Sequence, residues 1–116
     1  RSTGKELQVY GDANLLTLAL INLIRNALQA VEGQEDGIVR VDTCAGATGH
    51  LLIIITDNGP GIPPERLSAI FTPFFSTKSG GSGIGLPISQ RIMQLHGGQL
   101  SVSSIPNVRT EFRMEF

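Results

Sequence analysis

Residues 51–62 read Leu-Leu-Ile-Ile-Ile-Thr-Asp-Asn-Gly-Pro-Gly-Ile, and this stretch decides which kind of fold the chain can adopt. Leu51 to Thr56 is predicted to be a strand, and its apolar residues fall on both faces, as in a strand in the middle of a sheet. Asp57 to Pro64 is dense in glycine and proline, so the strand ends there. We therefore expect a central strand that carries a carboxylate and a glycine turn to one end of a sheet.

The residues before this strand predict a long helix and a second strand. Asp12 can cap a helix, and apolar residues on more than one helical face follow it up to Gly33, so we expect that helix to be largely buried. A turn at residues 34–37 leads into a strand from Ile38 to Ala45. A further strand is expected at about Leu7 to Tyr10.

The residues after the central strand predict two helices and two strands. A short helix is expected over residues 65–71, and a longer one from residue 83 or 84 to His96. Apolar and polar residues then alternate over 100–102 and 112–116, as in two amphipathic strands. This order predicts an α+β two-layer sandwich with a mixed sheet and about three helices on one face, and it disfavours a doubly wound dinucleotide fold.

Composition excludes several classes of protein. The 116 residues suit one domain, and 9 basic against 10 acidic residues give a net charge of -1, so we expect no nucleic acid partner and no direct membrane contact. Cys44 is the single cysteine, and His50 and His96 are the only histidines, which excludes cysteine-rich zinc sites and multi-histidine metal sites. Because the sequence begins with Arg1, we expect it to be a piece of a longer protein.

Six of the 14 glycines cluster within residues 59–85, at positions 59, 61, 80, 81, 83 and 85. The segment Gly80-Gly81-Ser82-Gly83-Ile84-Gly85-Leu86 opens the later long helix, where free backbone N–H groups and the helix dipole favour an anion. A flexible hinge would explain the same glycines equally well. The phosphate-loop pattern and the G-x-G-x-x-G pattern are both absent.

Two asparagines stand one turn apart inside the first long helix. The spacing of Asn22 and Asn26 puts both amides on one face, in or beside the core, where an unpaired amide costs about 1–3 kcal/mol. They are either satisfied by nearby backbone, or one carboxamide oxygen is a ligand for Mg²⁺. Spacing alone leaves both interpretations open.

The remaining candidates also have two interpretations. Asp57 can cap the turn that follows it, or accept a hydrogen bond from an exocyclic amine while Gly59 and Gly61 let a planar ligand approach the backbone. Phe71 to Lys78 contains three phenylalanines that would anchor one end of a lid, and Lys78 is either solvated or a point charge for phosphate. We interpret His96 as the last residue of a helix rather than a catalytic group.

Four segments together resemble one known family. Residues 22–27, 57–62, 71–78 and 81–86 are similar to the N box, first glycine box, F box and second glycine box of the ATP-binding catalytic domain of sensor histidine kinases. That superfamily (GHKL) includes gyrase-type topoisomerases, heat-shock chaperones and mismatch-repair ATPases. The resemblance spans about Asp12 to Phe116. It implies one domain over 1–116, with ATP held between the long helix and the lid.

The resemblance also implies roles for individual residues. Asn26 would ligate the Mg²⁺ that bridges the phosphates, Asn22 would support it, and Lys78 would approach the terminal phosphates, which makes these three the expected catalytic residues. Asp57 would accept the adenine amino group, and Thr110 would lie near adenine, although the family usually has glycine where Arg109 stands. The other implied nucleotide contacts are Arg25, Gly59, Gly61, Ile62, Phe71, Thr77, Gly81, Ser82, Gly83, Ile84, Gly85 and Leu86.

Two positions depart from family patterns. Gln29 stands where many members carry Lys or Arg, and Arg25 is the candidate to offset the missing charge. The hydrolysing members have Glu where Asn22 stands, and an amide cannot take the proton of an attacking water. Members that resemble histidine kinases commonly have Asn there.

The resemblance therefore implies a cytoplasmic histidine kinase domain, whose parent protein is free to be anchored in a membrane. It would transfer the γ-phosphoryl group to a histidine on a separate helical hairpin of the same protein, with a response regulator downstream. Two alternatives stay open at this point: an anti-sigma-type serine kinase and a non-catalytic nucleotide-sensing module.

Overall fold

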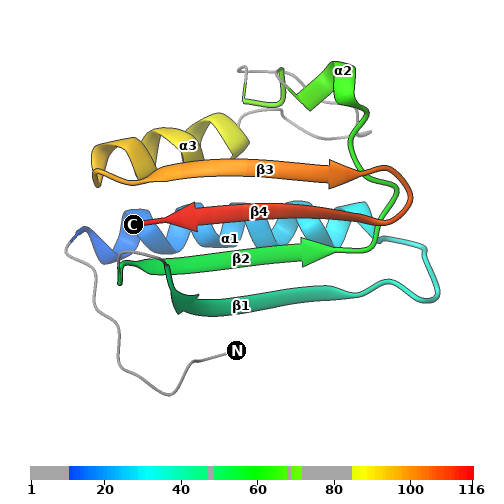
Figure 1. Cartoon of the computed structure of the whole chain (residues 1–116), viewed down its shortest axis with the longest axis horizontal. Coiled ribbons are helices and arrows are strands. Elements are labelled where there is room, and N and C mark those ends of the chain that lie inside the picture. Colours follow the sequence, from blue (N-terminus) through cyan, green and yellow to red (C-terminus); the bar gives the residue numbers. More distant parts are fainter. Residues whose placement is uncertain (1–10, 47–48, 68, 72–84) are drawn as a thin grey trace.

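The computed structural model describes residues 11–46, 49–67, 69–71 and 85–116. Its elements, in chain order, are α1 (Ala13–Ala30), β1 (Val39–Ala45), β2 (Leu51–Asp57), α2 (Pro64–Leu67), α3 (Gly85–Leu95), β3 (Gln99–Ile105) and β4 (Arg109–Glu115). The described strands form one sheet in the order β1-β2-β4-β3, and each neighbouring pair is antiparallel (Figure 1).

The helices α1 and α3 both lie on one face of this sheet, behind it in Figure 1. The core forms between the two layers, where Ile55 of β2 and its register partner Phe112 of β4 are each 1% exposed and Leu23 of α1 and Met93 of α3 are fully buried. The predicted α+β sandwich is thus confirmed. A mixed sheet was predicted, but the described strands are all antiparallel; the strand expected at residues 7–10 lies outside the described residues.

The first helix is less buried than its sequence indicates. Asp12 caps it, as predicted, by accepting hydrogen bonds from the N–H groups of Asn14 and Leu15 at 2.9 and 3.1 Å. The expectation of a largely buried helix was wrong, because Leu18, Ile21 and Leu28 are 42%, 44% and 55% exposed. In a two-layer fold the sheet covers a helix on one side only, so part of this broad apolar surface faces outward. No helix of the described residues is long and apolar enough to cross a lipid bilayer.

The two later helices lie where the sequence places them, but α2 is shorter than predicted. α2 was expected over residues 65–71 but covers Pro64–Leu67, and the chain continues in a turn in which the Ala69 N–H donates to the Arg66 carbonyl at 2.9 Å. An i to i+3 bond of this kind belongs to a tighter turn than the α-helix, so α2 is shorter than expected. α3 agrees with the prediction from Gly85 onward, while residues 83 and 84 lie outside the described part of the chain.

His96 connects the end of α3 to the start of α1. The Asp12 N–H donates to His96 Nε2 at 3.0 Å, and His96 Nδ1 donates to the Ile92 carbonyl at 2.7 Å. Because one nitrogen accepts and the other donates, the contacts require the neutral ring with its proton on Nδ1. The sequence indicated a helix-terminal residue here, and the structure adds a tertiary contact between the two long helices.

We predict that His96→Ala lowers the free energy of unfolding by about 1–2 kcal/mol, because it removes the acceptor for the Asp12 N–H at the start of α1. Urea denaturation followed by circular dichroism measures this. Gln94→Ala, at an exposed position near the end of α3, is the matched control and should change the free energy of unfolding by less than about 0.5 kcal/mol. Equal effects of the two substitutions would contradict the prediction.

Candidate functional site

A row of polar side chains crosses the sheet at one end of the apolar core. Asp57 on β2 is the register partner of Thr110 on β4, and Thr110 is the register partner of Ser104 on β3. Directly opposite residues of antiparallel strands point to the same face, which here is the face of Ile55 and the helices. Asp57 and Thr110 are 3% and 4% exposed, and the Ser104 and Thr110 hydroxyls are 3.1 Å apart. A carboxylate and two hydroxyls therefore meet below the helix layer.

The turn after β2 is fixed by hydrogen bonds to the strands beside it. The Gly59 N–H donates to Asp57 Oδ1 at 2.9 Å, so Asp57 caps the turn. This is one of the two roles that the sequence left open for it. The Ile62 N–H donates to Ser104 Oγ and the Asn107 N–H to the Pro60 carbonyl, both at 2.8 Å. A carboxylate has about four lone-pair sites, so capping the turn does not prevent Asp57 from accepting a bond from a ligand.

Two glycines of this turn are required by close packing. A Cβ at Gly59 would lie 2.8 Å from the Ala30 carbonyl oxygen, so the turn rests directly on the end of α1. Gly61 has a φ of +84°, and a Cβ there would lie 2.9 Å from Pro106 Cα. Only glycine adopts that backbone conformation without strain. The turn is therefore packed between α1 and the β3–β4 turn.

The amides of α1 approach this turn along one side of the helix. Asn22 and Asn26 are both half-buried and lie one helical turn apart, with exposed Gln29 next along the same stripe. Arg25 is exposed and is rotated by about 100° from Asn26, since each residue advances a helix by that angle. The stripe thus presents amide groups without a cation of its own, and it ends where Ala30 meets Gly59.

The structure brings together most of the predicted site residues that it describes. Asp57, Gly59, Gly61, Ile62 and Thr110 form the turn and the polar row, and Asn22 and Asn26 lie on α1. Of three further predicted residues on other segments, Phe71 and Leu86 pack against the core, and Gly85 is the first residue of α3. Six predicted contacts lie outside the described residues: Thr77, Lys78, Gly81, Ser82, Gly83 and Ile84.

The chemistry of the described part suits an amine, a hydroxyl-bearing ligand and a hard cation. A buried carboxylate accepts hydrogen bonds from an amino group, and amide oxygens are ligands that Mg²⁺ uses together with water and phosphate oxygens. Within the described residues, no group of three or more His, Cys, Asp or Glu side chains could hold a metal ion.

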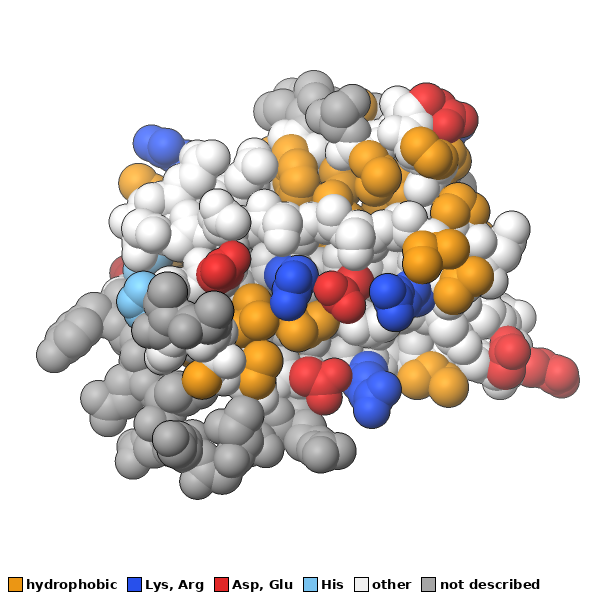
Figure 2. All heavy atoms as spheres, viewed as in Figure 1, with side chains coloured by type: hydrophobic (Ala, Val, Ile, Leu, Met, Phe, Trp, Pro, Cys, Tyr) orange, Lys and Arg blue, Asp and Glu red, His pale blue; other side chains and the backbone are white. Residues whose placement is uncertain are grey.

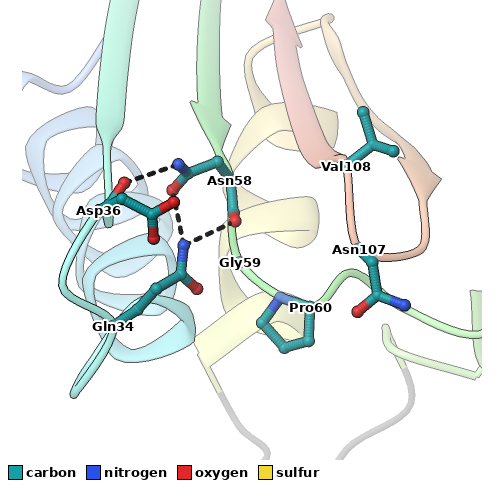
Figure 3. A pocket seen from close by; sticks show the side chains of 7 residues that line it. All are labelled: Gln34, Asp36, Asn58, Gly59, Pro60, Asn107 and Val108. Atoms are coloured by element: carbon teal, nitrogen blue, oxygen red, sulfur yellow. Dashed lines mark hydrogen bonds between the residues drawn. The ribbon is translucent and has the colours of Figure 1, made fainter.

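The sequence did not single out Ser104 or Asn58, and both have structural roles here. Ser104 accepts from the Ile62 N–H, as described above. Asn58 joins Gln34 and Asp36 on one side of an open cavity of about 390 Å³, whose other side is formed by Asn107 and Val108 (Figure 3). The one available signal was an asparagine directly after a buried strand, which indicates a turn but not its partners.

The opposite face of the sheet has a different character. Along β4 the outward residues are Arg109, Glu111, Arg113 and Glu115, and acidic and basic side chains alternate across the middle of Figure 2. Arg113 and Glu111 approach to 3.5 Å, as do Arg40 and Asp42 on β1. Exposed pairs of this kind contribute at most about 1 kcal/mol each. The two signs offset one another, so this face offers no concentrated charge for a ligand.

Comparison with known proteins identifies similar chains. The family model described as histidine kinase-, DNA gyrase B- and HSP90-like ATPase matches residues 11–116. The sensor histidine kinase ZraS of Salmonella typhimurium is 42% identical over 98 residues, which are 84% of this chain and 21% of that protein. Sporulation kinase C of Bacillus subtilis is 41% identical over 96 residues, which are 83% of this chain and 22% of that protein. The chain thus spans about a fifth of the length of these relatives.

A solved structure is similar to this chain in both fold and sequence. The catalytic domain of the histidine kinase ThkA superposes with a TM-score of 0.79 at 31% identity, over 97% of this chain and 74% of that one. The agreement therefore covers nearly the whole chain and most of the other domain.

We predict that Gly59→Ala lowers the free energy of unfolding by about 1–3 kcal/mol, because the added methyl group would overlap the Ala30 carbonyl and force the turn away from α1. Gly46→Ala is the matched control, since the nearest atom to a Cβ there lies at an ordinary contact distance of 3.5 Å. Chemical denaturation of both variants is the measurement. A Gly59→Ala variant as stable as Gly46→Ala would show that the turn does not rest on the helix.

Proposed function

Because the chain belongs to the family of histidine kinase-, DNA gyrase B- and HSP90-like ATPases, we propose that it binds ATP with Mg²⁺ and donates the γ-phosphoryl group to a histidine. It corresponds to the catalytic domain of the sensor histidine kinases in that family. The acceptor histidine lies on a separate helical-hairpin domain of the same protein in this proposal, and a response regulator receives the phosphoryl group afterwards. The location is cytoplasmic, where ATP is available.

One observation supports nucleotide binding most strongly: Asp57 is a buried carboxylate at the end of β2, opposite Thr110 on β4. A carboxylate accepts hydrogen bonds and therefore suits the exocyclic amino group of adenine, while guanine would direct a carbonyl oxygen to the same place. Gly59 and Gly61 keep the backbone of the turn free of side chains. Asp57 is thus proposed to hold and orient the base.

The amide stripe of α1 supports the phosphate end of the proposal. Asn26 would hold Mg²⁺ through its amide oxygen, with Asn22 one turn before it. When bound, Mg²⁺ would offset the negative charge of the phosphate groups. The amide of Asn22 cannot remove a proton from water, which disfavours hydrolysis relative to transfer. Lys78 and the second glycine box are proposed to complete the phosphate contacts.

Transfer needs an acceptor from outside this chain. The sequence has two histidines, and both ring nitrogens of His96 are already hydrogen-bonded. His50 lies in the connection between β1 and β2, directly before β2, and not on a helix. The domain therefore acts mainly by positioning: it holds the nucleotide at both ends and presents the γ-phosphoryl group to a docked partner.

The test is phosphotransfer to the hairpin domain of the same parent protein. With labelled Mg-ATP we expect the hairpin to become labelled by a phosphate that is lost in acid and stable in base, with little free phosphate released. An acid-stable label on serine or threonine would instead support the serine kinase, and nucleotide binding without transfer would support a sensing module. The relative ZraS is named as a sensor histidine kinase, which favours the first outcome.

We predict that Asp57→Asn raises the dissociation constant for Mg-ATP at least about tenfold, because it places an amide donor against the amino group of the base. The loss should exceed that of Lys78→Ala. Isothermal titration calorimetry measures both. Asp42→Asn makes the same chemical change on the opposite face of the sheet and should leave the dissociation constant unchanged; negligible losses for Asp57→Asn would show that the base is not held there.

We predict that Asn26→Ala removes most of the gain in ATP affinity that Mg²⁺ provides. Each protein is titrated with ATP in Mg²⁺ and in a chelator, so each is its own control. The variant and the unmodified chain should bind alike in the chelator and differ about tenfold or more in Mg²⁺. A variant that keeps the full Mg²⁺ dependence would remove Asn26 from the metal site.

A further inference from the structure

We infer that Asn58 is a positioning residue for nucleotide binding, which sets the spacing between the base end and the phosphate end of the site. The inference rests on the function proposed above and concerns a residue to which the family resemblance assigned no role. Asn58 follows Asp57 directly, and its side chain bonds to the segment between α1 and β1 (Figure 3).

The side chain of Asn58 makes three hydrogen bonds to that segment. Its Oδ1 accepts from the Ile38 N–H at 2.7 Å and from Gln34 Nε2 at 3.3 Å, and its Nδ2 donates to the Asp36 carbonyl at 2.8 Å. The backbone of Asn58 adds two more, because its N–H donates to the Ile38 carbonyl at 3.2 Å and its carbonyl accepts from Gln34 Nε2 at 3.0 Å. One residue therefore fastens the whole α1–β1 connection to the turn after β2.

This connection is itself joined tightly to the end of α1. The Gln34 N–H donates to the Val31 carbonyl at 3.0 Å, and the Gly37 N–H donates to the Gln34 carbonyl at 3.2 Å. A Cβ at Gly37 would lie 2.8 Å from Val31 Cβ, so the segment folds back closely onto the helix end. Holding residues 34–38 therefore also holds the last turn of α1.

The position requires an amide. Oδ1 accepts two bonds while Nδ2 donates one, and both atoms face backbone groups that cannot change their own roles. An aspartate has the same shape and keeps the acceptor, but it would turn a second oxygen toward the Asp36 carbonyl. An alanine loses all three side-chain bonds.

The consequence concerns the distance between two groups that bind the same molecule. Asp57 and Asn58 are adjacent, whereas Asn26 lies on α1 one turn before the Ala30 carbonyl that touches Gly59. If the side-chain bonds of Asn58 are lost, the two backbone bonds of Asn58 and the packing of Gly59 against Ala30 are what still join this connection and the end of α1 to the turn. ATP, which spans both ends, then fits less well, while adenosine, which reaches only the base end, is affected less.

The experiment compares Asn58→Ala and Asn58→Asp with Asn14→Ala, which makes the first change at an exposed position of α1. Dissociation constants for Mg-ATP and for adenosine are measured well below the unfolding midpoint of each variant. For both Asn58 variants we expect Mg-ATP to bind about tenfold more weakly and adenosine no more than about threefold more weakly. Asn14→Ala should change neither constant.

A merely structural role would lower the unfolding midpoint and leave the ratio of the two constants unchanged, and that result would overturn the inference. Should both Asn58 variants fail to fold, Gln34→Ala decides, since it removes only the two bonds from that side chain and is expected to shift the same ratio in the same direction. An unchanged ratio for a folded Gln34→Ala variant again contradicts the inference. Failure of the unmodified chain to bind ATP would contradict the proposed function itself, and is recognised before any variant is made.

Discussion

A carboxylate that is buried at the end of a central strand has to be met by hydrogen-bond donors, because an uncompensated buried charge costs several kcal/mol. Asp57 is 3% exposed, and the geometry of the chain around it follows from this requirement. The backbone turns back at once, so that the Gly59 N–H reaches the carboxylate, and that turn brings the backbone against the end of α1. The turn that caps this carboxylate is therefore also the point at which the chain contacts the end of α1.

The core changes from apolar to polar along β2 and β4. Ile55 and Phe112 form one cross-strand pair, and two residues further on the next pair is Asp57 and Thr110. Because side chains on one face of a sheet repeat every second residue, the polar row continues the apolar rows and needs no separate element. Ser104 extends it to β3 and fixes Ile62. A sheet face that is apolar in its middle and polar at one end therefore follows from ordinary strand register.

The sequence predicted what depends on neighbouring residues. The strand predicted over residues 51–56 and the capped helix after Asp12 follow from local patterns, and both are found, the strand with one further residue. Burial of α1 was predicted wrongly, since apolar residues around a helix do not reveal how many layers cover it. The hydrogen-bond partners of Asn58 lie 20 to 24 residues earlier, and Asp12, the partner of His96 at the start of the other long helix, lies 84 residues earlier. Local sequence patterns cannot predict contacts over such separations. The chemical roles came from the resemblance of four ordered segments, not from periodicity.

The turn that follows β2 is fastened on both sides, by Asn58 to the α1–β1 connection and by Pro60 and Ile62 to the β3–β4 hairpin. A segment held in this way has few conformations left to lose when a ligand arrives. Its ordering entropy has already been offset by the folding of the domain, so a ligand that binds to this turn does not have to order it. The shape that this turn presents to a ligand is therefore set when the chain folds, before any ligand binds.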